Sequence, residues 1–139
     1  AVLGLKLVPG RALGAGEDSV ASGPTPYVEG DPFPSIAEVQ VHWVLRNGRP
    51  ALVVFRSTSC VPCKAMAATV AQVRGDYEPD IVFIEVLTDD GANLGFVRAA
   101  QIRSIPTSIF VRASGESSGF VGAMREEQLR EALSRLLEE

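Results

Sequence analysis

Residues 51–66 of the chain read ALVVFRSTSCVPCKAM. They begin with five consecutive apolar residues, Ala51–Phe55, which is the pattern of a β-strand buried on both faces of a sheet. A short polar loop follows, and then Cys60 and Cys63 stand three residues apart where a helix is expected to begin. The chain contains no other cysteine. This stretch predicts a strand–loop–helix unit that carries a close pair of cysteines at its turn.

The composition is that of an ordinary globular protein, with 139 residues of which 46% are hydrophobic and 22% are charged. This length suits a single domain with a substantial core. The formal charge is −4 and basic residues do not cluster, so the sequence does not predict binding to nucleic acid. No apolar run approaches the roughly 20 residues of a membrane-spanning helix.

The first quarter of the chain differs from the rest in composition. Residues 1–34 hold six of the 13 glycines and five of the nine prolines, a content that favours extended, helix-free backbone. The first eight residues, AVLGLKLV, fit either an edge strand or the end of a targeting or anchor segment. We therefore expect an N-terminal extension or linker over 1–34, which could provide a membrane tether, and one domain over 35–139.

The rest of the chain alternates between helix and strand patterns. A first helix is expected after a capping box at Ser35–Glu38, with Ile36, Val39 and Trp43 on its apolar stripe. The expected strands are Ala51–Phe55, Ile81–Leu87, Thr107–Val111 and Ser118–Val121, and the later helices run from Cys63 to about residue 75, over Leu94–Ala100, and along the C-terminus with Leu129, Ala132, Leu133, Leu136 and Leu137 facing the core. This order predicts an α/β sandwich in which helices flank a central mixed sheet of four to five strands. The early strands are expected to pair in parallel and the last two to form an antiparallel hairpin.

The cysteine spacing indicates disulfide chemistry. Residues three apart on the first helical turn lie on one side, and their Cα atoms fall near the 5–6 Å that a disulfide spans. Pro62 is tolerated there because N–H groups of the first turn have no partner within the helix. The free N–H groups and the positive end of the helix stabilise a thiolate at Cys60, whereas Cys63 should be buried and keep its proton longer. Cys60 would then attack a substrate disulfide, and Cys63 would resolve the mixed disulfide.

Two other uses of the cysteines stay open at this point. A structural disulfide closing so short a loop would constrain the unfolded chain little. A metal site would need two more ligands, and the only histidine, His42, falls on the first expected helix, off its apolar stripe and on the expected surface. The spacing therefore favours redox chemistry, with no metal and no cofactor beyond the disulfide itself. A binding, adaptor or metal-handling module with little redox turnover is the alternative.

From about Ser35 to Glu139 the chain resembles the thioredoxin family. The motifs that carry the resemblance are Phe55, Cys60-Val61-Pro62-Cys63-Lys64, Ile102 with Arg103, Ile105-Pro106-Thr107 and Val121-Gly122-Ala123. The resemblance implies a thioredoxin-like fold and a thiol–disulfide oxidoreductase that acts on protein substrates. It also implies an upstream thiol reductase as electron donor, a part in electron transport and redox homeostasis, and a monomer.

The resemblance further implies a cis peptide bond between Ile105 and Pro106 that faces the cysteines. The backbone of Ile105 would then be free to pair with an extended substrate peptide, and Pro106 would keep metal ions from the sulfurs. The residues expected to contact substrate are Ser59, Val61, Pro62, Ile105, Val121 and Gly122.

The chain departs from the family at positions close to the cysteines. Val54 stands where the family has a buried aspartate that accepts the proton of the second cysteine, and Ser59 stands where it has a tryptophan. Glu85 interrupts the apolar run of a later strand, where burial would raise its pKa and let it accept a proton from Cys63. The alternative is that Glu85 lies at a solvated strand end or pairs with an arginine.

These departures and the N-terminal extension favour a specialised family member over a general cytoplasmic reductase. We expect an extracytoplasmic or membrane-tethered protein that keeps thiols reduced there. A cytoplasmic location is the alternative.

Overall fold

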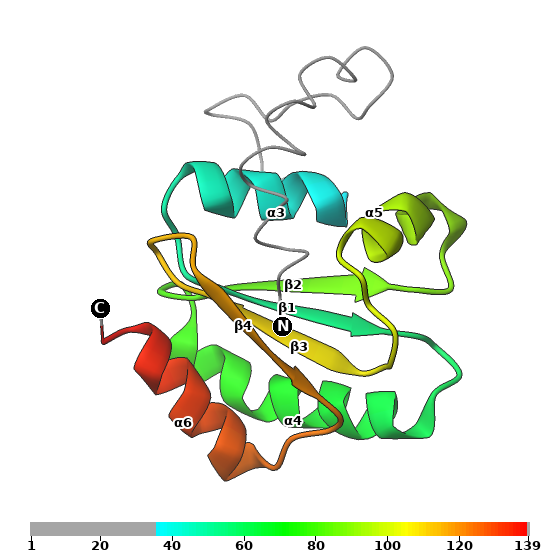
Figure 1. The fold of residues 1–139 in the computed structure, drawn as a ribbon. Coiled ribbons are helices and arrows are strands. Elements are labelled where there is room, and N and C mark those ends of the chain that lie inside the picture. The colour runs from blue at the N-terminus through cyan, green and yellow to red at the C-terminus, as the bar shows by residue number, and fades with distance from the viewer. Residues whose placement is uncertain (1–35, 139) are drawn as a thin grey trace.

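The computed structural model describes residues 36–138 (Figure 1). The predicted extension over 1–34 and the side chain of Ser35 in the predicted capping box lie outside the described residues. The strands are β1 (Ala51–Arg56), β2 (Val82–Leu87), β3 (Thr107–Val111) and β4 (Ser117–Val121). The helices are α3 (Ala37–Arg46), α4 (Val61–Tyr77), α5 (Leu94–Ala99) and α6 (Glu126–Leu136), with a 3-10 turn, η3 (Gly91–Asn93), ahead of α5.

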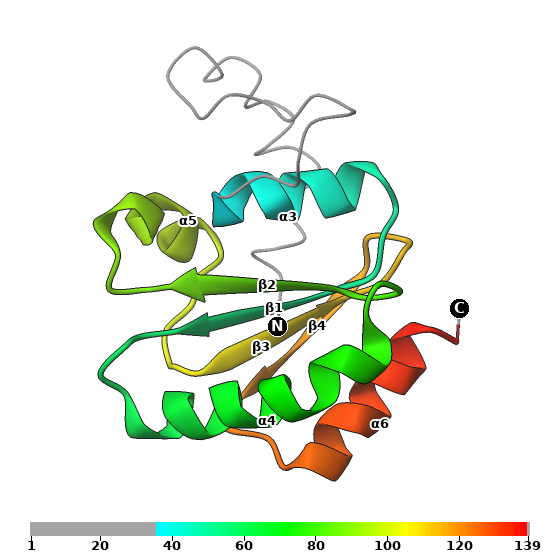
Figure 2. The same ribbon diagram turned by 180° about the vertical axis from the view of Figure 1, so that it is seen from behind.

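The four strands form one mixed sheet in the order β2-β1-β3-β4. β1 pairs in parallel with β2 and antiparallel with β3, and β3 pairs antiparallel with β4. Two helices cover each face, because α3 and α5 lie on one side of the sheet and α4 and α6 on the other (Figures 1 and 2). The predicted α/β sandwich, with its early parallel pair and its final antiparallel hairpin, is confirmed.

β1 is buried from Ala51 to Phe55 because it is a central strand with helices over both faces. Alternate residues of β1 therefore enter two separate cores. Beneath α3 and α5 the core contains Val53, Phe55, Val86, Phe96, Ile109 and Val111. Beneath α4 and α6 it contains Leu52, Val54, Met66, Val73, Phe110, Leu129 and Leu133.

The buried face of α3 differs from the predicted stripe. Ile36 is 48% exposed and precedes the helix as its N-cap, and Trp43 is only partly buried against the core. Apolar residues recur so often along this helix that two stripes can be drawn through them, and packing against the sheet selects one. Val39 of the predicted stripe is buried, and the other buried residues of α3 are Ala37, Val41 and Val44.

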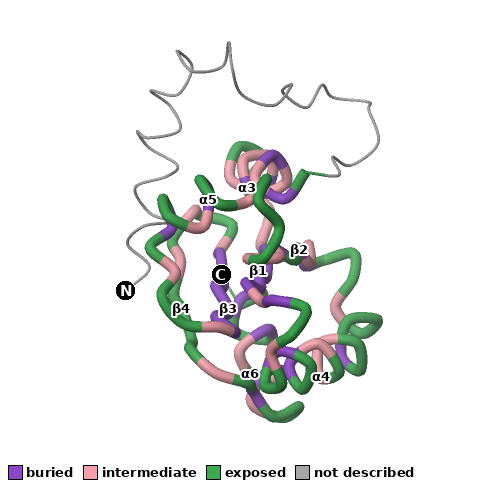
Figure 3. Tube along the Cα trace, turned by 90° about the vertical axis from the view of Figure 1, so that its right-hand side faces the viewer, coloured by how far each residue is buried: buried purple, intermediate pink, exposed green. Residues whose placement is uncertain are grey.

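The strand around Glu85 was expected to be buried, and this expectation is wrong. β2 lies at one edge of the described sheet, and only two of its residues, Ile84 and Val86, are buried. In contrast, β1 and β3 are buried almost throughout (Figure 3). An edge strand can carry a charged side chain because water reaches it there.

α6 packs its leucines against the α4 side of the sheet, as the sequence predicts. Leu129, Leu133 and Leu136 are buried, but Leu137 is 43% exposed because the helix has ended at that residue. Two ion pairs between residues four apart lie along α6, with 2.9 Å between Arg130 Nε and Glu126 Oε2 and 2.8 Å between Arg135 Nη2 and Glu131 Oε2.

Truncating Leu133 tests this packing. We expect Leu133→Ala to lower the free energy of unfolding by about 2–5 kcal/mol, because it opens a cavity in a fully buried position. Leu137→Ala is the matched control and should cost less than about 1 kcal/mol. Chemical denaturation measures both, and equal losses would mean that α6 packs with a different face.

Candidate active site

The first turn of α4 holds both cysteines. Cys60 is the N-cap residue, and its Sγ accepts a hydrogen bond from the backbone N–H of Cys63 at 3.2 Å. Pro62 lies in the first turn, where its missing N–H costs no helical bond. Cys60 is partly exposed, whereas Cys63 is fully buried. One sulfur is therefore open to a substrate, and the other lies behind it.

The two cysteines form a disulfide, with a Cα–Cα distance of 5.1 Å. When this disulfide is reduced, a thiolate at Cys60 keeps the N–H of Cys63 and the positive end of a 17-residue helix as its stabilising partners. Cys63 has no comparable exposure to solvent. The arrangement therefore favours ionisation of Cys60, as the spacing predicts.

Asp89 braces the loop that leads from β1 to the cysteines. Its Oδ2 accepts from the backbone N–H of Thr58 at 3.2 Å and also from the Thr58 hydroxyl. The hydroxyl contact is the largest of several causes that lower the pKa of Asp89. The local sequence Asp89-Asp90-Gly91 is typical of a simple turn and does not predict this contact. Because Arg56 pairs with Leu87 in the parallel register, residues two positions beyond each strand end can meet.

The predicted substrate residues of the later chain meet at the end of the sheet where β1 leads to the cysteines. This end of the strands is called the active-site edge below, and it is distinct from the lateral edge formed by β2. Thr107 pairs with Phe55 on β1 and with Val121 on β4, so the end of β1, the start of β3 and the end of β4 lie in one row. The peptide bond between Ile105 and Pro106 is cis. The N–H of Gly122 donates to the carbonyl of Pro106 at 2.8 Å and holds the two segments together. Gly122 has a φ of +108°, a conformation that glycine adopts without strain.

This edge carries exposed apolar side chains. Val61 is 75% exposed and Val121 is 64% exposed, the two highest values among the large hydrophobic residues of the described chain. Ser59 and Pro62 are also exposed, and Ile105 is partly buried. The patch is small because Ser59 presents only a hydroxyl beside Cys60.

Glu85 lies under α4, away from this edge. It pairs across the sheet with Val54, and its carboxylate forms an ion pair with the guanidinium of Arg56. The Glu85 side chain is 51% exposed and that of Arg56 is 20% exposed. Both line a cavity of about 510 Å³, which is also lined by Val54 of β1 and Ala67 of α4. Thus the carboxylate is half-exposed and paired, not buried and isolated.

His42 takes no part in the cysteine site. It lies on α3, across the sheet from α4 (Figure 2). It is half-buried, not exposed as expected, and burial followed by the charge of Arg46 lowers its pKa. Residues 36–138 contain no cluster of three or more histidine, cysteine, aspartate or glutamate side chains placed to hold a metal ion. In the same span, no helix is both long and apolar enough to cross a bilayer.

A three-layered α/β/α sandwich with a CxxC disulfide at a helix N-terminus is the architecture of a thiol–disulfide exchange protein. The model of the thioredoxin-like domain family matches residues 37–137. Thioredoxin of Borreliella burgdorferi is 31% identical over 85 residues, covering 61% of this chain and 71% of that protein. Thioredoxin of Pyropia yezoensis is 30% identical over 96 residues, covering 68% of this chain and 86% of that protein.

Solved structures agree on the fold. Chloroplastic thioredoxin z superposes with a TM-score of 0.62 at 19% identity, covering 73% of this chain and 90% of its own. The germline-specific thioredoxin Deadhead of Drosophila melanogaster superposes with a TM-score of 0.59 at 25% identity, covering 75% of this chain and 99% of its own. The chain belongs to the thioredoxin-like family and is a thiol–disulfide oxidoreductase, and Cys60 and Cys63 form its CxxC disulfide. Proteins of this family act on the disulfides of protein substrates.

The pH dependence of stability tests the brace at Asp89. Because its folded pKa is lowered below the ordinary value of 3.8, Asp89 stabilises the fold above that pH, and the contribution is lost as pH falls through the folded pKa. We expect Asp89→Asn to destabilise the protein at pH 6 and to differ less from wild type below pH 3.8. Asp80→Asn, in an exposed turn, is the control. A difference between Asp89→Asn and wild type that is the same at both pH values would contradict the brace.

Proposed function

We propose that this protein is a reductase of protein disulfides. The observation that carries the proposal is the difference between the two cysteines. Cys60 is partly exposed and its Sγ accepts a hydrogen bond from the Cys63 N–H, whereas Cys63 is fully buried. An attacking thiol needs access and a stabilised thiolate, and a resolving thiol needs only to reach the attacking one.

The proposed reaction has two exchange steps. The Cys60 thiolate attacks one sulfur of a client disulfide, forms a mixed disulfide and releases the other client sulfur as a thiolate. Cys63 then loses its proton and attacks Cys60, which releases the second client thiolate. The client gains two electrons, and the protein is left with the Cys60–Cys63 disulfide seen in the structure. An upstream thiol reductase would return two electrons to the pair.

The exposed apolar edge supports docking of an extended client segment. In this proposal the backbone of Ile105 pairs with the client, next to the cis bond to Pro106. Ser59, Pro62 and Gly122 leave room around the sulfur because their side chains are small or absent. The other apolar contacts would come from Val61 and Val121, which are exposed at this edge.

Two measurements on the full chain test the direction of electron flow. The reduction potential of the Cys60–Cys63 pair, found by equilibration with a dithiol buffer, should lie well below that of the glutathione pool. Reduction of insulin by the protein with a chemical reductant should be catalytic, and Cys60→Ser should abolish it. A potential above the glutathione pool would make the protein an oxidant or isomerase. No insulin reduction would favour the alternative of a binding or adaptor module.

We also propose that Glu85 accepts the proton of Cys63 during the second step. Val54 cannot accept a proton, and Glu85 is its cross-strand neighbour on the α4 side of the sheet. Ala67, which lines the same cavity as Glu85, lies one helical turn after Cys63 on the same face of α4. The cavity of about 510 Å³ is large enough to hold water beside Glu85, and its wall at Ala67 lies one helical turn from Cys63. The ion pair with Arg56 would keep the carboxylate oriented toward this space.

The pH dependence of client reduction tests this role. We expect Glu85→Gln to slow reduction roughly tenfold or more at neutral pH, with recovery at alkaline pH where Cys63 ionises unaided. Glu78→Gln is the matched control because Glu78 is similarly exposed and also pairs with an arginine, Arg74, at 2.7 Å. Profiles of wild type and Glu85→Gln that coincide would remove Glu85 from the mechanism.

The proposal extends to the setting of the domain. We place a thioredoxin-like domain at 35–139, supported by the family match over 37–137, and a linker at 1–34, supported by its glycine and proline content. We further propose an extracytoplasmic or membrane-tethered monomer that keeps client thiols reduced, with residues 1–34 as the tether. Secretion of the complete gene product fused to a reporter, compared with a cytoplasmic control, would locate the domain.

A further inference from the structure

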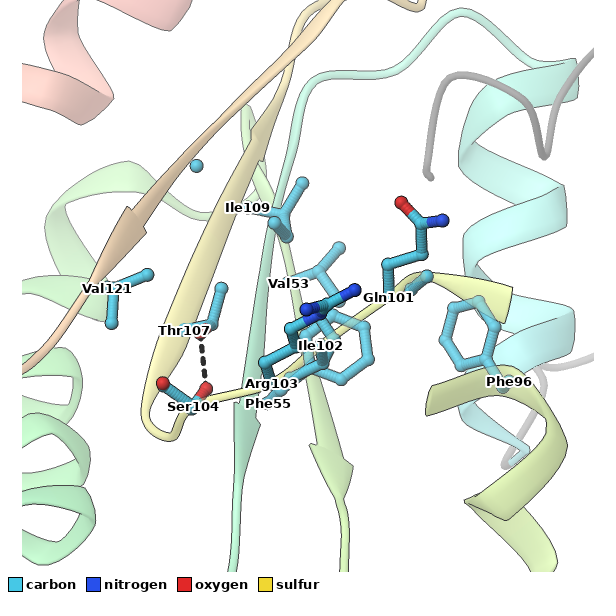
Figure 4. A pocket seen from close by; sticks show the side chains of 12 residues that line it. Val53, Phe55, Phe96, Gln101, Ile102, Arg103, Ser104, Thr107, Ile109 and Val121 are labelled. Atoms are coloured by element: carbon cyan, nitrogen blue, oxygen red, sulfur yellow. Dashed lines mark hydrogen bonds between the residues drawn. The ribbon is translucent and has the colours of Figure 1, made fainter. Parts of the chain in front are cut away.

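An apolar cavity lies on the side of the sheet opposite the cysteine helix. Its volume is about 240 Å³, and Val53, Phe55 and Ile109 contribute to it from β1 and β3 (Figure 4). Phe96 of α5 lines the side of the cavity away from β4. On the β4 side the cavity is lined by Gly119, which has no side chain. Gly119 pairs with Ile109, and both line the cavity.

The size of the cavity limits what it can hold. An apolar cavity of about 150 Å³ accommodates a benzene ring, so this one has room for one large aliphatic or aromatic side chain. Sites for complete small-molecule cofactors are usually larger, about 300 Å³ or more. The cavity fits a single residue of a polypeptide better than it fits a cofactor.

The cavity is continuous with the edge where clients are proposed to dock. Val121 and Thr107 line it, and they directly precede Gly122 and follow Pro106 in the chain. The hydroxyl of Thr107 donates to the carbonyl of Ser104 at 2.6 Å, which fixes the loop before Ile105 against the cavity wall (Figure 4). A chain passing Ile105 therefore reaches the cavity without crossing another element.

The mouth of the cavity is positively charged. Arg103 lines it together with the amide of Gln101, and no carboxylate is among the lining residues. Arg103 is exposed, and within residues 36–138 its side chain makes no ion pair or hydrogen bond. An acidic residue next to the bound side chain would therefore meet an available guanidinium.

We propose that this cavity is a specificity site that takes one large apolar side chain of the client polypeptide, with an adjacent acidic residue at Arg103. The inference rests on the proposed function, because the client must first dock beside Ile105. It assigns a sequence preference to the enzyme: clients with an aromatic or branched residue followed by an acidic residue, a few positions from the reacting cysteine, are reduced faster.

Peptide disulfides test the preference with the full chain. Short peptides with one cysteine in disulfide linkage to glutathione would carry a Phe-Glu pair that is moved stepwise along the sequence, with Ala-Glu and Phe-Lys peptides for comparison. At one position we expect kcat/KM for Phe-Glu to exceed that for Ala-Glu roughly tenfold or more. Phe-Lys should fall below Phe-Glu, and Arg103→Gln should remove that second difference.

Filling the cavity provides the matched variants. Gly119→Leu places a side chain over Ile109 in extended backbone and should bring the Phe-to-Ala ratio close to one. Ser118→Leu adds the same side chain on the same strand but on the opposite face, and should keep the ratio of wild type. A ratio close to one at every position in wild type, or the same ratio in both variants, would overturn the inference.

Methyl NMR of Val53 and Ile109 separates this inference from the proposed function. The Phe-Glu peptide with serine in place of cysteine should shift these methyl signals, and the Ala-Glu peptide should not. Shifts without reduction of any disulfide peptide would reject the reductase and keep the site. Methyl signals that move with protein concentration would show that a second copy fills the cavity. Nuclear Overhauser contacts between these methyl groups and residues 1–35 in the free protein would show that the chain itself fills it. Either result would overturn the inference.

Discussion

The pairing of β1 on both of its edges is the constraint on which the site depends. β2 joins it in parallel and β3 antiparallel, and helices cover both faces, so the direction and register of β1 are set by burial along its whole apolar run. The chain leaves β1 at the sheet edge and enters α4 with Cys60 as its N-cap. The hydrogen bond from the Cys63 N–H to Cys60 Sγ is therefore a consequence of where the strand ends.

Hydrogen bonds between distant segments complete the edge. Thr58 is tied to Asp89 beyond the end of β2, and Pro106 is tied to Gly122 beyond the end of β4. Each of these bonds joins residues that follow or precede paired strands, so the sheet register brings them together. The loops on both sides of the disulfide are thus held before a client arrives, which lowers the cost of ordering them on binding.

The two faces of the sheet differ in what lies beside the active-site edge. On the α4 side the strand position of Val54 carries no charge, and the Arg56–Glu85 ion pair brings charge from an edge strand that water can solvate. On the α5 side, an apolar cavity opens toward the same edge as the disulfide. In the proposed mechanism, chemistry and client recognition therefore meet at one edge from opposite faces.

The sequence by itself determined the features that rest on local pattern. The apolar run at Ala51–Phe55, the cysteine spacing and the leucine face of α6 each follow from strand or helix periodicity, and they were enough to predict the sandwich and the redox pair. The family resemblance added the later half of the site, including the position of Pro106. These features need no knowledge of which element packs on which.

Only the tertiary structure decided the features that depend on neighbours. The buried stripe of α3 was misjudged because Val39, Val41 and Val44 permit more than one face. Glu85 was expected to be buried because its strand reads as apolar, but β2 is an edge strand and Arg56 is within reach. The contact of Asp89 is not predicted by the local sequence because its partner, Thr58, is distant in sequence and meets it only through the parallel register. Periodicity reports which residues prefer burial, whereas strand order and register decide which of them are buried and what they contact.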